Sequence, residues 1–239
     1  KDKFRFTDDV KGGWSKNPSM PESWNIQYQY HNLNLTLRLA LTGFGHVGIF
    51  PEQGCNWNFI YDCIRRWDSR KPKVLNLFAY TGAASVVARM AGAEVVHCDA
   101  SRPGLNWANQ NMQLNNVSDI RWVYEDAFKF VRREVKRGNR YQGIILDPPA
   151  FAKNKDSLEG ALRGYKEINN RAMRLLRPGG ILLLDNVLWG GDILTLYAVF
   201  GFGLLLVRDW SDRNLLLAGA PLAALDYRTP ADAARSALP

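Results

Sequence analysis

The stretch Val74-Leu-Asn-Leu-Phe-Ala-Tyr-Thr-Gly82 decides the fold, because it joins a short apolar run to a loop with a single glycine. The run Val74–Phe78 has the length and composition of a buried strand, and the small residues from Gly82 to Met90 are typical of a helix packed on a sheet. Further strands are predicted at 94–98, 120–124, 141–146 and 181–184, and further helices at 104–114, 127–136 and 158–176. Strands that alternate with helices indicate parallel units with right-handed crossovers. The sequence therefore predicts an α/β fold with a mostly parallel sheet and helices on both faces.

The remaining segments have different patterns. Residues 1–24 are polar, and we expect a flexible lead-in there. Apolar residues alternate on both sides of His31-Asn32, and helical spacing follows from Trp57 to Trp67, so residues 25–70 are expected to form a small β-hairpin and a helix. We expect the Rossmann-like sheet domain at 71–225, where 204–207 and 215–217 are candidates for an edge hairpin, and a disordered tail at 226–239.

Composition limits the class of protein. Of the 239 residues, 46% are hydrophobic and 12% aromatic, which is typical of a globular chain. The richest apolar stretch, 193–207, is short and broken by two glycines, so we expect a buried segment and no membrane span. The three cysteines, Cys55, Cys63 and Cys98, lack CxxC spacing, which argues against a zinc site and favours a reducing compartment. We expect a cytoplasmic protein, or an organellar one if a targeting segment precedes Lys1.

The formal charge of +8 favours a polyanionic partner. The densest cationic cluster follows the predicted helix at 127–136 and comprises Lys129, Arg132, Arg133, Lys136, Arg137 and Arg140. These residues share much of one helical face. Either they form the solvated exterior of the helix, or they bind the phosphates of a nucleic acid.

The residues that directly follow the strands are the candidate site, because ligands of open parallel sheets bind at the carboxyl ends of the strands. The first loop has one glycine, Gly82, where a dinucleotide site would have several, so a ligand without a pyrophosphate fits better. Asp99 ends the second strand roughly twenty residues later, where a carboxylate accepts from ribose hydroxyls. Asp126 ends the third strand, and it is suited either to accept from an adenine amino group or to cap the helix that follows.

Asp147-Pro-Pro after the fourth strand is the most specific motif. Two successive prolines remove backbone donors and stop the strand, which leaves the carbonyls of Asp147 and Pro148 as acceptors beside a reacting group. Phe151 is suited to stack on a flat substrate such as a nucleobase. The alternative is a rigid loop with a buried phenylalanine, and we favour the functional interpretation.

Several motifs together resemble the class I methyltransferases that modify large-subunit ribosomal RNA at cytosine C5. They are Leu75-Asn-Leu-Phe-Ala-Tyr-Thr-Gly-Ala83, Cys98-Asp-Ala-Ser101, Leu146-Asp-Pro-Pro-Ala-Phe-Ala-Lys153, Leu162-Arg-Gly-Tyr-Lys166, Leu176-Arg-Pro-Gly-Gly180 and Gly48-Ile-Phe-Pro-Glu-Gln53. The resemblance runs roughly from Pro21 to Leu184. It implies S-adenosylmethionine as the cofactor, surrounded by Phe50, Gln53, Phe78, Tyr80, Thr81, Gly82, Asp99, Ala100, Ser101, Asp126, Ala127 and Asp147.

The chain departs from that group after the fifth strand, where its members carry the cysteine that attacks the pyrimidine. Here the strand leads into Leu184-Asp-Asn-Val-Leu-Trp-Gly-Gly191, without a cysteine. This segment resembles the motif of metal-dependent O-methyltransferases that act on catechols. That resemblance implies Mg²⁺ at Asp147, Asp185 and Asn186. Alternatively, Asp185 and Asn186 merely end a strand.

Three hypotheses for the function follow. The leading one is an S-adenosylmethionine-dependent methyltransferase that acts on a base of RNA, most plausibly ribosomal RNA, with Asp147, Pro148 and Phe151 at the acceptor. The second is a Mg²⁺-dependent O-methyltransferase that acts on a small catechol-like molecule. The third is a cofactor-binding or RNA-binding protein that has lost its catalytic site.

Overall fold

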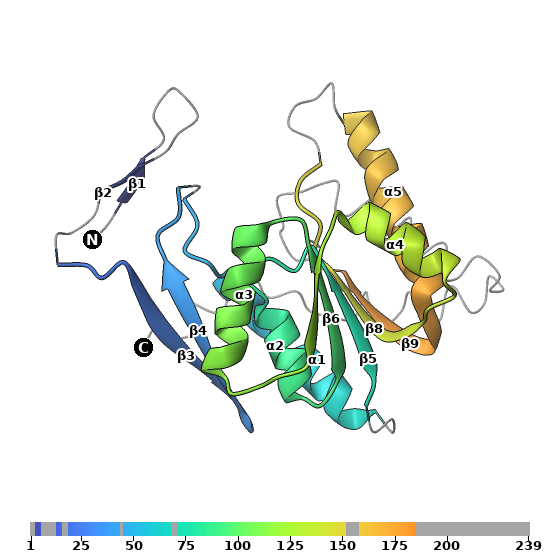
Figure 1. The fold of residues 1–239 in the computed structure, drawn as a ribbon, viewed down its shortest axis with the longest axis horizontal. Helices are drawn as coiled ribbons and strands as arrows, with labels where there is room; N and C mark the ends of the chain where they lie inside the picture. Colours follow the sequence, from blue (N-terminus) through green and yellow to red (C-terminus); the bar gives the residue numbers. More distant parts are fainter. Residues whose placement is uncertain are drawn as a thin grey trace, which may run out of the picture. The chain divides into compact units, whose positions relative to one another are not determined.

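A parallel sheet with the strand order β7-β6-β5-β8-β9 organises the chain (Figure 1). The computed structural model describes residues 3–5, 13–15, 19–43, 45–67, 71–151 and 158–184. In chain order, the sheet consists of β5 (Lys73–Leu77), β6 (Glu94–Asp99), β7 (Ile120–Tyr124), β8 (Tyr141–Leu146) and β9 (Leu176–Leu184). The chain builds outward from β5 to β7 and then returns to place β8 on the other side of β5. This reversal creates the switch point at which ligands bind in such sheets.

Helices cover both faces of the sheet, as predicted (Figure 1). One face packs against α1 (Gly54–Arg66), α2 (Ala83–Met90) and α3 (Arg102–Leu114), and the other against α4 (Ala127–Lys136) and α5 (Leu158–Leu175). Successive residues of a strand point to opposite faces, so Val74 joins the first apolar core while Leu75 and Leu77 join the second. The continuous apolar run of β5 is therefore explained by burial on both sides.

A separate hairpin, β3 (Ser23–Tyr30) and β4 (Leu33–Ala40), packs on the first core and turns at His31-Asn32 as predicted. Its alternating leucines, Leu33 to Leu39, are buried. Two asparagines of α3 fasten the free edge of β4. The Asn111 side chain accepts from the backbone N–H of Arg38 at 2.9 Å, and the Asn115 side chain both accepts from and donates to the backbone of Thr36 at 2.7 Å. The hairpin is thus held at a fixed place beside α3.

The structure differs from the predicted elements in three places. Within the predicted lead-in, β1 (Lys3–Arg5) pairs with β2 (Gly13–Ser15). Helix α1 begins at Gly54, earlier than predicted, because a 3₁₀ turn, η1 (Pro51–Gln53), leads directly into it. Strand β9 begins at Leu176, earlier than predicted, because Leu176 already pairs with Tyr141 of β8. The next pair is Gly143 with Ile181, so residues 177–180 form a bulge between the two pairs.

The predictions for residues beyond Leu184 lie outside the described residues. They concern Asp185, Asn186, the end of the sheet domain, the edge hairpin at 204–217 and the tail at 226–239.

Candidate functional site

The candidate site is a cavity of about 70 Å³ at the carboxyl end of β5, beside the switch point of the sheet. It brings together residues from the segment before the sheet and from the ends of β5 and β8. Seven predicted cofactor residues line it, namely Phe50, Gln53, Phe78, Tyr80, Thr81, Gly82 and Asp147. Other lining residues were not predicted, among them Trp57, Asn76 and Ile145. The predicted residues Asp99, Ala100, Ser101, Asp126 and Ala127 lie at the ends of the neighbouring strands, outside the cavity wall.

The loop Phe78–Gly82 has an unusual backbone. Phe78, Tyr80 and Gly82 have φ angles of 56°, 48° and 80°, which place two non-glycine residues in the left-handed region. Such residues persist where the surroundings over-determine them, and they concentrate at functional sites. The loop is held by a hydrogen bond from Gly82 N–H to the Ala79 carbonyl at 3.0 Å and by contacts from three other parts of the chain.

Two glycines make these contacts possible. A Cβ on Gly82 would lie 2.7 Å from the Cβ of Ala108, so only glycine lets α2 approach α3 at this point. A Cβ on Gly48 would lie 2.2 Å from the Trp107 ring, and Gly48 has a φ of 100°. The Thr81 hydroxyl donates to the Gly48 carbonyl at 2.5 Å, which joins the two loops. Close approach at these positions thus brings the segment of Phe50 and Gln53 to the cavity.

Asp99 connects the loop after β5 to the loop after β6. One carboxylate oxygen accepts from the backbone N–H of Tyr80 at 2.8 Å, and the other accepts from the backbone N–H of Ser101 at 2.7 Å. A carboxylate oxygen has two acceptor sites, so each oxygen can accept a further hydrogen bond. The Asp99 carboxylate, together with burial, raises the pKa of Tyr80, burial being the larger cause. Asp99 therefore holds the loop in place, and each of its carboxylate oxygens can still accept a hydrogen bond from a hydroxyl group.

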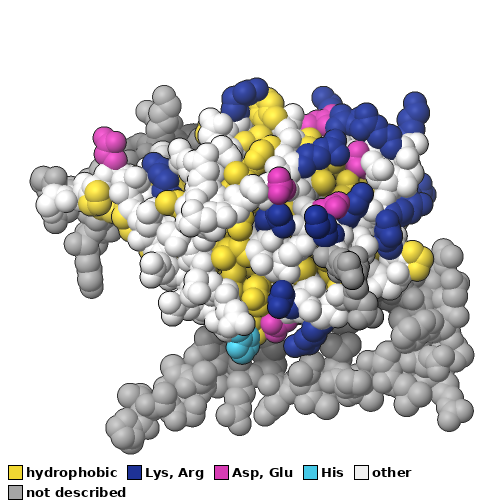
Figure 2. Space-filling view, turned by 60° about the horizontal axis from the view of Figure 1, so that its bottom comes forward, with side chains coloured by type: hydrophobic (Ala, Val, Ile, Leu, Met, Phe, Trp, Pro, Cys, Tyr) yellow, Lys and Arg dark blue, Asp and Glu magenta, His cyan; other side chains and the backbone are white. Residues whose placement is uncertain are grey.

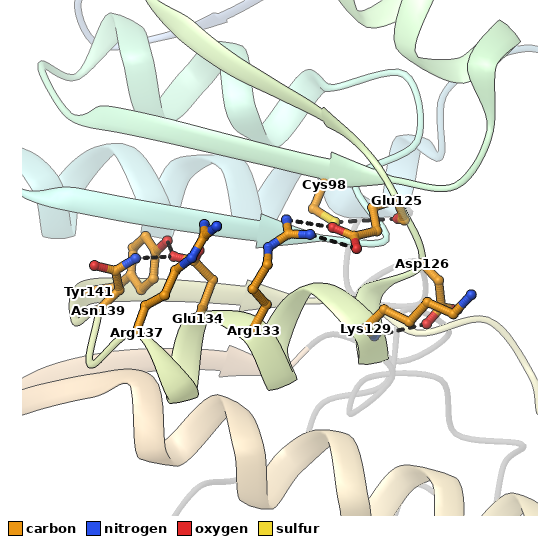
Figure 3. A network of polar contacts seen from close by, with 9 residues as sticks. All are labelled: Cys98, Glu125, Asp126, Lys129, Arg133, Glu134, Arg137, Asn139 and Tyr141. Atoms are coloured by element: carbon orange, nitrogen blue, oxygen red, sulfur yellow. Dashed lines mark hydrogen bonds and ion pairs between the residues drawn. The ribbon is translucent and has the colours of Figure 1, made fainter.

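Ser101 and Asp126 both cap helices. The Ser101 hydroxyl accepts from Gly104 N–H at 3.1 Å at the start of α3, and Asp126 accepts from Lys129 N–H at 3.0 Å at the start of α4 (Figure 3). The helix-cap alternative for Asp126 is therefore confirmed, and it leaves the second carboxylate oxygen for another donor. Ala100 is exposed, whereas Ala127 is buried beneath the start of α4.

The Asp147-Pro-Pro loop is clamped by Tyr165 of α5, which belongs to the motif Leu162–Lys166 but had no predicted role. The Tyr165 hydroxyl donates to the Pro149 carbonyl at 3.1 Å and accepts from Phe151 N–H at 3.3 Å. Asp147 is half-buried at the cavity and Pro148 is buried. No local pattern could have shown this clamp, because its partners are 14 and 16 residues apart in the sequence.

Phe151 lies in an aromatic cluster. Its ring centroid is 4.4 Å from that of Tyr165, 5.7 Å from that of Phe128 and 6.1 Å from that of Phe78. Gly164 permits this packing, since a Cβ there would lie 3.2 Å from the Phe151 ring. The structure thus gives Phe151 the packing role that the sequence offered as an alternative. Stacking of Phe151 on a substrate base stays a prediction.

The cysteines offer no activated thiol at the cavity. Cys98 is fully buried below Glu125, whose backbone carbonyl accepts from its thiol at 3.5 Å (Figure 3). Burial, with help from the carboxylates of Glu125 and Asp99, raises the pKa of Cys98 to about 12, so its reactive thiolate is suppressed. Cys55 and Cys63 lie on α1, and burial raises the pKa of Cys63.

Of the three metal ligands suggested by the second resemblance, Asp147 lies at the cavity, and Asp185 and Asn186 lie outside the described residues. Among the residues that the structure describes, no cluster of three His, Cys, Asp or Glu side chains could hold a metal ion. Likewise, none of the described helices is long and apolar enough to span a membrane.

The sheet order and the covering helices define a Rossmann-like domain with a cavity at the switch point of the sheet. The chain belongs to the S-adenosylmethionine-dependent methyltransferase family, whose model matches residues 3–195. This agrees with the family predicted from the motifs.

Three relatives illustrate the similarity. The chain is 48% identical over 114 residues to ribosomal RNA large subunit methyltransferase I of Salmonella arizonae, covering 46% of this chain and 28% of that protein. It is 44% identical over 143 residues to the protein of the same name from Aeromonas salmonicida, covering 58% and 35%. The crystal structure of the SAM-dependent methyltransferase from Agrobacterium tumefaciens is similar with a TM-score of 0.64 and 35% identity, over 75% of this chain and 57% of that one. The matched region thus spans about a third of the length of the curated relatives.

Proposed function

We propose that this chain transfers a methyl group from S-adenosylmethionine to a base of ribosomal RNA. The observation that carries the proposal is the Phe78–Gly82 loop, a single-glycine turn that Asp99 holds in a strained backbone at the switch point. A pyrophosphate needs close backbone approach at more than one glycine, so this loop favours a ligand made of a nucleoside and an amino acid. Family membership and the names of the curated relatives support the same cofactor and an RNA substrate.

The residues present fit this cofactor. Asp99 would accept from the ribose hydroxyls, and the second oxygen of Asp126 would accept from the adenine amino group. The rings of Phe50 and Tyr80, with centroids 5.9 Å apart, stand beside the cavity and would stabilise a sulfonium by their negative faces. A cavity of about 70 Å³ is too small for the whole ligand, so the methionine end would enter it while the adenosine lies across the strand ends.

The acceptor base would lie beside Asp147 and Pro148. The cofactor supplies an activated methyl group, so the chain itself needs only to position the acceptor and exclude water. The carboxylate and carbonyls of the Asp147-Pro-Pro loop would accept hydrogen bonds from the base, and Tyr165 keeps that loop in place. The proposal does not extend to cytosine C5, because Cys98 is buried and the two other cysteines of the sequence lie on α1.

Calorimetric titration with S-adenosylhomocysteine tests the cofactor, with NAD as the control ligand. We expect binding of S-adenosylhomocysteine alone. A folded protein that binds neither ligand, or that binds NAD equally well, would contradict the proposal.

Transfer of a labelled methyl group to unmodified ribosomal RNA tests the substrate, and analysis of the nucleosides then identifies the acceptor atom. Parallel reactions with catechol and Mg²⁺ separate the O-methyltransferase alternative. Cofactor binding without any transfer would instead support a protein that has lost catalysis. An rRNA substrate would place the enzyme where ribosomes are assembled, in the cytoplasm or in an organelle.

A further inference from the structure

A second cavity, of about 440 Å³, lies at the opposite end of the sheet, where the strands begin. It is lined by residues at or beside the first positions of β5, β6, β7 and β8, such as Lys73, Glu94, Arg121 and Tyr141. The strands are five or six residues long at about 3.3 Å per residue, so the two cavities lie at opposite edges of the sheet. The proposed methyl transfer makes no use of this second cavity.

The second cavity is strongly cationic. Five of its lining residues are cations, namely Lys71, Lys73, Arg89, Arg121 and Arg140, whereas Glu94 and Asp119 are its two carboxylates. Lys73 pairs with Glu94 at 3.9 Å and Arg89 pairs with Asp119 at 3.3 Å. Within the described part of the chain, Lys71, Arg121 and Arg140 form no ion pair with a carboxylate. Among the described residues, three positive charges of the cavity are therefore not balanced by a carboxylate.

A strip of cations joins this cavity to the site edge of the sheet. Helix α4 begins at Ala127, after the carboxyl end of β7, and ends at Lys136, shortly before Arg140 and the amino end of β8. Lys129 and Lys136 are exposed near the two ends of α4, which is about 15 Å long for ten residues. Figure 2, turned so that the bottom of Figure 1 comes forward, shows Lys and Arg side chains gathered on one half of this face, with several Asp and Glu side chains among them.

Not every cation of α4 is available to a partner. The Arg133 guanidinium forms two short contacts with Glu125, at 2.6 and 2.8 Å (Figure 3). Arg132 pairs with Glu167 at 2.6 Å. Arg137 lies 3.6 Å from the fully buried Glu134, which also accepts from Tyr141 and Asn139 at 2.7 Å. Arg133 and Glu134 thus tie α4 to the sheet through Glu125 and Tyr141, whereas Arg132 ties α4 to Glu167 of α5.

We propose that the second cavity, at the amino edge of the sheet, binds backbone phosphates of the RNA substrate. The exposed cations along α4 would contact further phosphates of the same RNA between this cavity and the methyl-transfer site. This inference rests on the proposed function for the identity of the substrate. A single small anion would neutralise only part of the unpaired charge, whereas a polyanion can contact the cavity and the strip together. Phosphate contacts of this kind fix the register of a nucleic acid without reading its sequence.

The test compares two double variants that remove the same charge. Arg121→Gln with Arg140→Gln removes two unpaired cations of the cavity, and Arg65→Gln with Arg66→Gln removes two exposed cations at the end of α1 that do not line it. Fluorescence anisotropy with a labelled, mixed-sequence single-stranded RNA gives the affinity at several salt concentrations. Titration with S-adenosylhomocysteine checks that the opposite edge is intact in both variants.

Loss of two phosphate contacts should make the slope of log affinity against log salt shallower by about 1.4, and should weaken RNA binding about tenfold at 0.15 M salt. We expect this for the cavity variant, with near wild-type RNA binding in the α1 variant and unchanged cofactor binding in both. Equal effects in the two variants would overturn the proposal, as would a wild-type chain that binds no RNA. Both variants are also titrated with inorganic phosphate. A cavity variant that loses phosphate binding but keeps its RNA affinity would identify a small-anion site and would also overturn the proposal.

Failure of methyl transfer is a separate result, because the RNA affinity is measured without turnover. A cavity variant that selectively loses RNA affinity would support the phosphate site even if no acceptor base is found.

Discussion

The substitution Asp99→Asn should lower both the stability of the protein and its affinity for the cofactor. In the wild-type chain, the carboxylate accepts from Tyr80 N–H at 2.8 Å and from Ser101 N–H at 2.7 Å. An asparagine has the same shape but only one acceptor atom, so its NH₂ group would face one of these N–H donors.

The magnitude follows from these two bonds. A hydrogen bond to a charged group contributes about 1.5–3 kcal/mol, and Asp99 is half-buried, so water will replace part of the loss. We expect a decrease of about 2–3 kcal/mol in the free energy of unfolding, measured by urea denaturation. Affinity for S-adenosylhomocysteine should fall about 10- to 100-fold, because losing one ribose hydrogen bond to the charged carboxylate would cost about 1.5–3 kcal/mol of binding free energy.

Asp119→Asn is the matched control, since that side chain is 79% exposed and its contacts, with Arg89 and Ser118, are at the surface. It should leave both quantities near the wild-type values. If Asp99→Asn destabilises the protein but binds S-adenosylhomocysteine as tightly as the wild type, Asp99 supports the loop without binding the ribose. If neither quantity changes, the argument from these hydrogen bonds is refuted.

Three further predictions concern the loops and the core. Gly82→Ala should destabilise the protein by about 2–4 kcal/mol in urea denaturation, because a left-handed backbone and a contact at 2.7 Å with Ala108 both oppose the methyl group; a neutral effect would contradict this. Tyr165→Phe keeps the ring but releases the Pro149 carbonyl, so methyl transfer to RNA should slow while the free energy of unfolding changes by about 1 kcal/mol or less; unchanged kinetics would argue against the clamp. Burial lowers the pKa of His97 to about 3, so the unfolded chain binds a proton below pH 6.5 that the folded chain refuses, and stability should fall as the pH drops from 6.5 toward 3. Between pH 7 and pH 5 the loss should be about 2 kcal/mol in the wild type and absent in His97→Gln, and equal losses in both would refute this assignment.

The sequence was sufficient to predict most of the sheet. The buried run before Phe78 and the acidic residues that end the next strands are local signals, because periodicity and strand-stopping residues act within a few positions. The parallel order then places all the carboxyl ends at one edge. Seven of the predicted cofactor residues line the cavity at that edge.

The predicted boundaries of some helices and strands were less accurate, because strand pairing depends on residues that are far apart in the sequence. Arg177-Pro-Gly-Gly180 is typical of a break after a helix, yet β9 starts before it because Leu176 pairs with Tyr141 on the neighbouring strand. Strand pairing can absorb such residues as a bulge, and the sequence of one strand does not contain its partner.

What the sequence determined by itself is the class of fold, the edge of the sheet at which the candidate residues gather, and the single-glycine loop after the first strand. Only the tertiary structure decided that Asp99 supports Tyr80, that Gly48 receives the Thr81 hydroxyl, that Tyr165 clamps the proline loop, and that unpaired cations gather at the amino edge. The spacing of apolar residues predicts which face of a helix or strand is buried, because this spacing involves only residues close together in the sequence. It does not tell which distant side chain meets that face, since this is settled when whole elements pack together.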